Sequence, residues 1–331
     1  MNLSFAPKAV GAVSSVAALV CGSTFLYYES LPKDWKAALS REGIVLLSSD
    51  SENAYKAIYL ENKDFLNVDL GIDNSKNETE AIKEIQKWCD AELNQEYKPE
   101  IVLDREKVIK YCADITPKTL IGVLQKRGIS SSGFIGGDGE DYKVMFAVYK
   151  YNQTFLDAIN KAKKDSESNY SETTEASSGY ERLKTWCENS LKKPTSEIEG
   201  ETLYNQVEWW CRPLGYKTVL EKINKDHPTW KSEATTQVGQ GTNWEKIKEF
   251  WKATPEVYKA VGNNEEAVNS STLSGDKFRG WCEDTLKKKI YDPKVYKRDY
   301  LVAKVVCVEQ KVQNNLTTKS LQESLKSSSE S

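Results

Sequence analysis

Histidine and methionine are scarce in this sequence: its 331 residues include one histidine, His227, and two methionines. Histidine is the commonest general base and metal ligand in proteins, so its near absence excludes most familiar catalytic and metal-binding arrangements. No C-x-x-C pair occurs either, and the glycine-rich stretch 133–139 lacks the Gly-Lys-Ser/Thr ending of a phosphate-binding loop. We therefore predict no catalytic residue, no metal site and no cofactor.

A strong excess of charge is also missing. Lys and Arg number 46 against 49 for Asp and Glu, which gives a formal net charge of -3. Such a chain has no global field of the kind that gathers polyanions, so we predict no nucleic-acid partner. Hydrophobic residues make up 39% and charged residues 29%, the composition of a folded chain long enough for two or three compact units.

The amino terminus carries an uncharged run, residues 9–28. Twenty helical residues at about 1.5 Å each match the hydrocarbon core of a bilayer, which is about 30 Å thick. Lys8 before the run and Glu29 after it favour a cytoplasmic amino terminus, which would place the rest of the chain outside. We interpret residues 1–32 as a membrane anchor or signal segment that contacts the lipid bilayer through residues 9–28.

Other interpretations of this segment stay open. The run is rich in Ala, Gly and Ser, so a signal peptide cleaved near Gly22 or Ser23 fits almost as well. Cys21 raises the alternative of lipidation, although Val20 is not the small residue that normally precedes a lipidated cysteine. A buried N-terminal helix of a cytosolic protein is the alternative without export. The anchor, the cleaved signal and the lipidated form all place the body of the chain outside the cell.

A cysteine motif, W-C-[DE]-x-x-L, occurs three times and is followed each time by a second cysteine 23, 24 or 25 residues later. The resulting pairs are Cys89 and Cys112, Cys187 and Cys211, and Cys282 and Cys307. Because tryptophan and cysteine are rare residues, we interpret the recurrence as an internal repeat. It predicts tandem units at 33–115, 116–213 and 214–310, followed by a disordered tail at 311–331.

The residues around each motif follow helical spacing. Tyr180, Leu183, Cys187 and Leu191 are 3, 4 and 4 residues apart, which places them on one face of a helix. The second cysteine of each pair ends a similar pattern, and turn-rich sequence lies between the two. We therefore predict a mainly α fold: an N-terminal transmembrane or signal helix, then three helical repeat units, each with a disulfide-linked helical hairpin.

Some longer elements are also expected. Helices are predicted over 142–164 and 243–262, with Pro255 starting a new turn or kinking the second. The stretch 166–178 is rich in Ser and Glu and is predicted to be a loop.

The compartment decides what the cysteines mean. Six cysteines at matched spacing indicate a disulfide framework outside the cell, whereas in the cytosol they would suggest metal or redox chemistry. The export segment favours disulfides, and closing each loop would stabilise its unit by about 3 kcal/mol on the chain-entropy model. The alternative is that these cysteines are small apolar side chains on buried helix faces.

The tryptophans beside the cysteines recur with the helix period, which indicates core packing rather than ligand platforms. Trp209 and Trp210 are the exception because, in two adjacent helical residues, an outward face is guaranteed by geometry. We predict this doublet as a possible contact surface.

Taken together, these features resemble the large paralogous families of uncharacterised proteins in haemotropic mycoplasmas. The likeness includes the uncharged N-terminal segment, the repeated W-C-[DE]-x-x-L, the later matched cysteine and the Lys/Ser/Asn-rich connections. It covers nearly the whole chain, which departs from the family in having three units where a shorter arrangement is common. The resemblance implies export and a role as a candidate surface antigen, and it supplies no catalytic residue.

The functional prediction is a membrane-anchored, surface-exposed helical repeat protein without catalytic activity, which contacts a host surface protein or acts as an antigen. The alternative is a cell-envelope scaffold that binds other bacterial proteins. A third hypothesis is an extracellular hydrolase that uses carboxylates brought together by the fold.

Overall fold

The computed structural model describes residues 31–98, 104–135, 139–164, 166–228, 244–252, 254–262 and 273–307. Over these ranges the chain is mainly α-helical, as predicted, and extended pairing is limited to isolated bridges. None of the helices in these ranges is both long enough and apolar enough to cross a membrane. The predicted anchor at 9–28 and the predicted tail at 311–331 lie outside the described residues.

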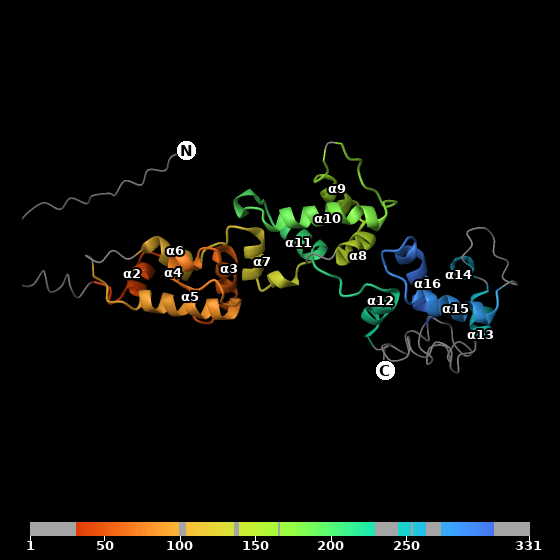
Figure 1. The fold of residues 1–331 in the computed structure, drawn as a ribbon, viewed down its shortest axis with the longest axis horizontal. Helices are drawn as coiled ribbons and strands as arrows, with labels where there is room; N and C mark the ends of the chain where they lie inside the picture. The colour runs from red at the N-terminus through yellow and green to blue at the C-terminus, as the bar shows by residue number, and fades with distance from the viewer. Residues whose placement is uncertain are drawn as a thin grey trace, which may run out of the picture. The chain divides into compact units, whose positions relative to one another are not determined.

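The chain forms two compact units, one ending at Pro117 and the other beginning at Lys118. The first unit contains α2 (Trp35–Arg41), α3 (Glu52–Asn62), α4 (Leu66–Leu70), α5 (Glu78–Leu93) and α6 (Arg105–Cys112), which are shown in Figure 1 in red to yellow-orange.

The second unit contains the residues of both the second and the third predicted repeats. Its earlier elements are α7 (Leu120–Lys126), η1 (Ser131–Gly133), α8 (Glu140–Tyr149), α9 (Gln153–Asn160), α10 (Ala176–Leu191), η2 (Thr195–Glu197) and α11 (Thr202–Trp210). Its later elements are α12 (Val219–Asp226), α13 (Trp244–Trp251), α14 (Pro255–Val261), α15 (Gly275–Thr285), η5 (Val295–Asp299) and α16 (Tyr300–Val306).

Short polar side chains cap the N-termini of helices α2, α7 and α12. Asp34 accepts a hydrogen bond from the backbone N–H of Ala37, and Thr119 and Thr218 act in the same way at α7 and α12. Each of these side chains satisfies a backbone donor that has no partner inside its helix. Gly43 and Gly128 follow α2 and α7 with φ of 84° and 87°, a left-handed conformation that glycine adopts without strain.

The helices that carry the W-C-[DE]-x-x-L motif are α5, α10 and α15, here called the motif helices. The same three capping residues pair with the backbone that follows these helices. The bridges are Asp34 with Glu96, Thr119 with Pro194, and Thr218 with Lys289. Each partner lies seven residues after the first cysteine of its pair. The flanking residues exchange backbone hydrogen bonds of 2.8 to 3.2 Å, so each of these helices has its beginning tied to the end of the motif helix.

The motif helices form the centre of the hydrophobic cores. In the first unit α5 packs on α3 and α6; in the second unit α10 packs on α8, α9 and α11 (Figure 1), and α15 packs on α13 and α16. Close approach requires a small residue at Gly179 of α10, because a Cβ there would lie 2.2 Å from the ring of Phe146 on α8. Large side chains fill the remaining space, and Phe146 and Phe155 are fully buried.

Two predicted long helices are each divided in the structure. The helix expected over 142–164 ends at Tyr149 and restarts at Gln153, because the side chain of Asn152 accepts from the backbone N–H of Phe155 and caps α9. The helix expected over 243–262 is divided into α13 and α14, with Pro255 in the first turn of α14. Proline suits that position because its missing N–H would have no helical partner there.

Candidate functional site

The predicted cysteine pairs all lie at disulfide-bonding distance. The S–S distances are 2.05 Å for Cys89–Cys112, 2.06 Å for Cys187–Cys211 and 2.00 Å for Cys282–Cys307. All six cysteines are buried, and the pairs link α5 to α6, α10 to the end of α11, and α15 to the end of α16. Each pair therefore fastens a motif helix to the helix that closes its hydrophobic core.

The structure separates the two tryptophans of the predicted contact surface. Trp209 is 59% exposed, whereas Trp210 is 3% exposed and packs its ring 5.2 Å from Phe155 and 5.4 Å from Trp186. Trp210 precedes the buried Cys211 and lies on the inner side of α11. It is a core residue, contrary to the prediction, and only Trp209 presents its side chain to solvent.

Trp209 borders a groove of about 560 Å³. Thr202, Asn205 and Gln206 line the groove from the same face of α11, and Asn152 lines it from the start of α9. Amide and hydroxyl groups both donate and accept hydrogen bonds, and none of the lining residues carries a formal charge. Tyr149, Thr154 and Trp210 complete the lining, so the exposed part of the predicted surface borders an uncharged groove with both amide or hydroxyl groups and aromatic rings in its walls.

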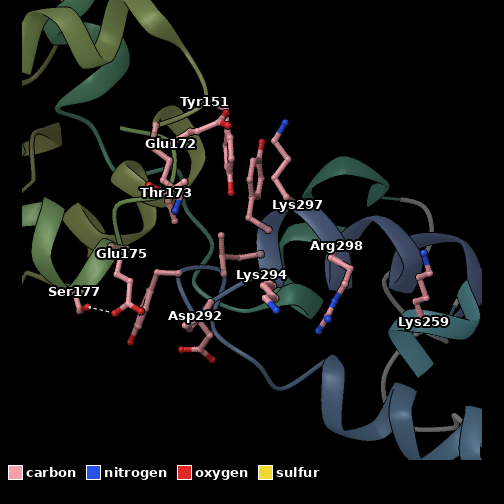
Figure 2. A pocket seen from close by; sticks show the side chains of 17 residues that line it. Tyr151, Glu172, Thr173, Glu175, Ser177, Lys259, Asp292, Lys294, Lys297 and Arg298 are labelled. Atoms are coloured by element: carbon pink, nitrogen blue, oxygen red, sulfur yellow. Dashed lines mark hydrogen bonds between the residues drawn. The ribbon is translucent and has the colours of Figure 1, made fainter. Parts of the chain in front are cut away.

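A cavity of about 770 Å³ lies elsewhere in the second unit, where residues 290–298 face the end of α8 and the stretch 172–177 (Figure 2). Ion pairs of Glu140, at the start of α8, help to fix the segments that form this cavity. The Glu140 carboxylate accepts from Lys289 Nζ at 2.8 Å and pairs with Lys217 Nζ at 3.0 Å. These two ammonium groups lower the pKa of Glu140 from 4.5 to about 2.

One wall of the cavity is basic. Lys294, Lys297 and Arg298 come from the chain at η5, and Lys259 comes from α14 (Figure 2). The charge of Arg298 is already paired, because its Nε donates to Asp299 Oδ1 at 2.6 Å. Lys259 and Lys297 have no carboxylate within ion-pair distance among the residues that the structure describes. The basic wall therefore holds cations that solutes in the cavity can reach.

Stacked tyrosines form a second wall. The rings of Tyr151 and Tyr296 lie 6.2 Å apart at 23°, and Tyr300 stacks behind Tyr296 at 6.2 Å and 4°. Lys297 Nζ lies 4.3 Å from the centre of the Tyr151 ring, close enough for a cation–π contact. Burial raises the pKa of both Tyr151 and Tyr296, which keeps these phenols neutral and able to donate.

The third wall presents carboxylate and hydroxyl groups. Glu172, Thr173, Glu175 and Ser177 line it, and the Ser177 hydroxyl donates to a Glu175 oxygen at 3.3 Å (Figure 2). Lys150 ties this wall to α8 because its Nζ donates to the backbone oxygen of Thr174 at 2.9 Å. Glu172 and Glu175 thus lie on one side of the cavity and the basic residues on another, where Asp292 adds one carboxylate.

The backbone of the basic wall is unusual. Lys294 has φ of 67°, the left-handed region, and no other non-glycine residue in the described ranges has a positive φ. The five residues that follow, Val295–Asp299, form a π-helical turn. A left-handed lysine costs about 1 to 2 kcal/mol, and strained residues and π-turns are both frequent where proteins bind ligands. No feature of the sequence around Lys294 predicted the left-handed residue or the π-helical turn.

The described ranges contain no group of three or more His, Cys, Asp or Glu side chains arranged to hold a metal ion. Comparison of the chain with profiles of protein families, with curated proteins and with solved structures found no match.

Proposed function

We propose that this protein is exported, anchored through residues 9–28, and displayed outside the cytoplasm as a binding protein that contacts a host surface or acts as an antigen. The observation that carries the proposal is the set of three cysteine pairs at bonding distance. Disulfides persist in oxidising compartments and are rare in the cytosol, where thiols are kept reduced. A chain with three such pairs is suited to work outside the cell.

We further propose that the body of the protein consists of three versions of one helical unit. The recurring bridge seven residues after each first cysteine supports this interpretation, as do the capping residues Asp34, Thr119 and Thr218. The matched cysteine separations of 23, 24 and 25 residues support it too. Versions of one unit would share their buried positions and be free to differ outside.

The less buried side of the closing helices differs in this way. Two residues before the second cysteine of each pair stand Lys110, Trp209 and Val305, which are a cation, an exposed aromatic ring and an aliphatic side chain. Buried residues immediately follow in each case: Tyr111, Trp210 and Val306. A stable interior with a changeable exterior suits a protein that presents contact surfaces.

Display can be tested on intact cells that express the full chain. A membrane-impermeant amine reagent should label exposed lysines such as Lys192 and Lys297 before lysis, while a cytosolic marker protein stays unlabelled. Thiols should be alkylated at harvest and the peptides mapped without reduction. We expect 89 linked to 112, 187 to 211 and 282 to 307; labelling only after lysis, or free thiols at all six positions, would show that the proposal is wrong.

The kind of partner needs a separate test. Purified protein should capture a component from host membranes, and Trp209→Ala should weaken that capture if the groove on α11 takes part. Phe65→Ala is the matched control, since Phe65 is a similarly exposed aromatic residue (56%) in the first unit. Capture only from extracts of the producing cell's own envelope would favour the scaffold alternative.

A further inference from the structure

We propose that the 770 Å³ cavity between η5 and the stretch 172–177 binds an acidic saccharide, a hydroxyl-rich sugar that carries a carboxylate or sulfate group. This inference adds a ligand class to the proposed contact role. It concerns the folded second unit in solution, so its test is independent of where the protein is displayed.

The charge of the cavity favours an anion. Five basic and three acidic side chains line it, and the basic ones include Lys259 and Lys297, which have no carboxylate partner among the described residues. A ligand anion that reaches these ammonium groups forms charge-assisted hydrogen bonds, which are stronger than neutral ones. The volume lies within the range of about 300 to 1,000 Å³ that is usual for small-molecule sites.

The opposite wall limits how much negative charge the ligand carries. Glu172 and Glu175 repel a ligand charged along its whole length, such as a nucleoside triphosphate. The same carboxylates, with Thr173 and Ser177, accept hydrogen bonds from hydroxyl groups. A fatty acid would cover these groups without giving them partners, which is costly. An anion at one end and hydroxyls at the other satisfy both walls.

The aromatic wall favours a ring. Tyr151 and Tyr296, whose rings lie 6.2 Å apart at 23°, both line the cavity, and the edges of these rings can contact the C–H groups of a sugar ring while its hydroxyls reach the polar groups. A free phosphate or sulfate ion would occupy a small part of the volume and leave the tyrosines unused. The left-handed Lys294 and the π-turn after it bring the three basic residues of the segment 294–298 to the cavity wall.

The test uses the purified, disulfide-intact full chain and two matched probes, a galactose trisaccharide with one terminal galacturonate residue and the neutral galactotriose, in calorimetric titrations at about 50 mM salt, where screening is moderate. We expect the acidic sugar to bind at least about tenfold more tightly than the neutral one. Lys294→Asn/Lys297→Gln should weaken it by about tenfold or more, and asparagine at 294 tolerates the left-handed backbone. Tyr151→Ala should weaken binding, and Tyr151→Phe should restore it.

The control removes the same charge elsewhere. Lys192→Gln/Lys287→Gln neutralises two exposed lysines outside the cavity and should leave affinity within about twofold. A measurement on the unaltered chain guards against misfolded variants: the acidic trisaccharide should protect Lys259, Lys294 and Lys297 from acetylation and leave Lys192 reactive.

Several outcomes would overturn the inference. Equal affinity for the two sugars, equal weakening by the pocket and control variants, or equal protection of Lys192 would each show that the cavity does not select an acidic sugar. Tighter binding of inorganic phosphate or of phosphocholine would assign the cavity to a different ligand. None of these results bears on whether the protein is displayed on cells.

Discussion

Helices α6 and α11 each close a core with a cysteine at or just after their last residue, and they differ on the side that faces away from it. Tyr111 and Trp210, the residues before those cysteines, are both buried aromatic rings. One position earlier, Lys110 pairs with Asp69 at 2.7 Å, whereas Trp209 is exposed beside a groove. The cystine and the helix period constrain the inner positions, and the outer positions are free to acquire different chemistry.

The sharpest way to break this comparison is to truncate the two neighbouring tryptophans in turn. Trp210→Ala should lower the free energy of unfolding by about 3 to 5 kcal/mol, because it removes a buried ring and leaves a cavity. Trp209→Ala should change it by about 0.5 kcal/mol or less. Urea unfolding of the disulfide-intact chain measures both. Similar losses for the two variants would contradict the division between inner and outer positions.

A second test asks whether the two cysteine pairs contribute equally. Cys187→Ala/Cys211→Ala and Cys89→Ala/Cys112→Ala should each destabilise their own compact unit by about 3 kcal/mol, since they free loops of nearly equal length in the unfolded chain. Hydrogen–deuterium exchange read by peptide should show faster exchange in the altered unit alone. If only one pair mattered, the interpretation of α6 and α11 as versions of one closing helix would fail.

The third test compares two glycines of the motif helices, one in close contact with a neighbouring helix and one with no close neighbour. Gly179→Ala should cost about 1 to 3 kcal/mol, because the added methyl group overlaps the ring of Phe146. Gly280→Ala on α15 is the control: a Cβ there meets nothing within 4 Å, so alanine should stabilise the helix by about 0.5 to 1 kcal/mol. Thermal unfolding of the two variants should therefore shift in opposite directions.

The smallest effect is expected at Glu140, whose partly exposed carboxylate binds Lys289 and Lys217. Its folded pKa of about 2 lies below the ordinary 4.5, so its ionised form stabilises the fold above about pH 4.5, and this contribution is lost as the pH falls towards 2. Allowing for solvent screening, Glu140→Gln should be less stable than the parent by about 1 kcal/mol at pH 7.

A pH series of denaturant unfolding checks this assignment. The difference between the parent and Glu140→Gln should shrink between about pH 4.5 and 2. A difference that stayed constant over this range would show that the carboxylate charge is not responsible.

Local sequence patterns predicted the helical class and the cysteine partners, because Cys187 stands on an apolar stripe with helical spacing and its partner recurs at a matched distance. The Trp209–Trp210 doublet was ambiguous for a related reason: periodicity alone did not assign which of two adjacent rings faces the core. The break before α9 had a readable signal in Asn152, a residue that favours helix N-caps.

The cavity could not be predicted in the same way. Its walls join Tyr151, Glu172, Lys259 and Lys297, which are separated by up to about 150 residues and belong to no motif. The left-handed conformation of Lys294 is imposed by its surroundings, since lysine has no intrinsic preference for it. Sites assembled by packing of distant segments become visible only once the fold is known.

The cystines have a mechanical consequence. Each closes 23 to 25 residues into a covalent loop. When the two ends of the chain are pulled apart, each disulfide therefore withholds about 80 Å of backbone length from extension. A molecule stretched by its ends would thus extend less than a chain without cystines, and single-molecule stretching before and after reduction should reveal the added length.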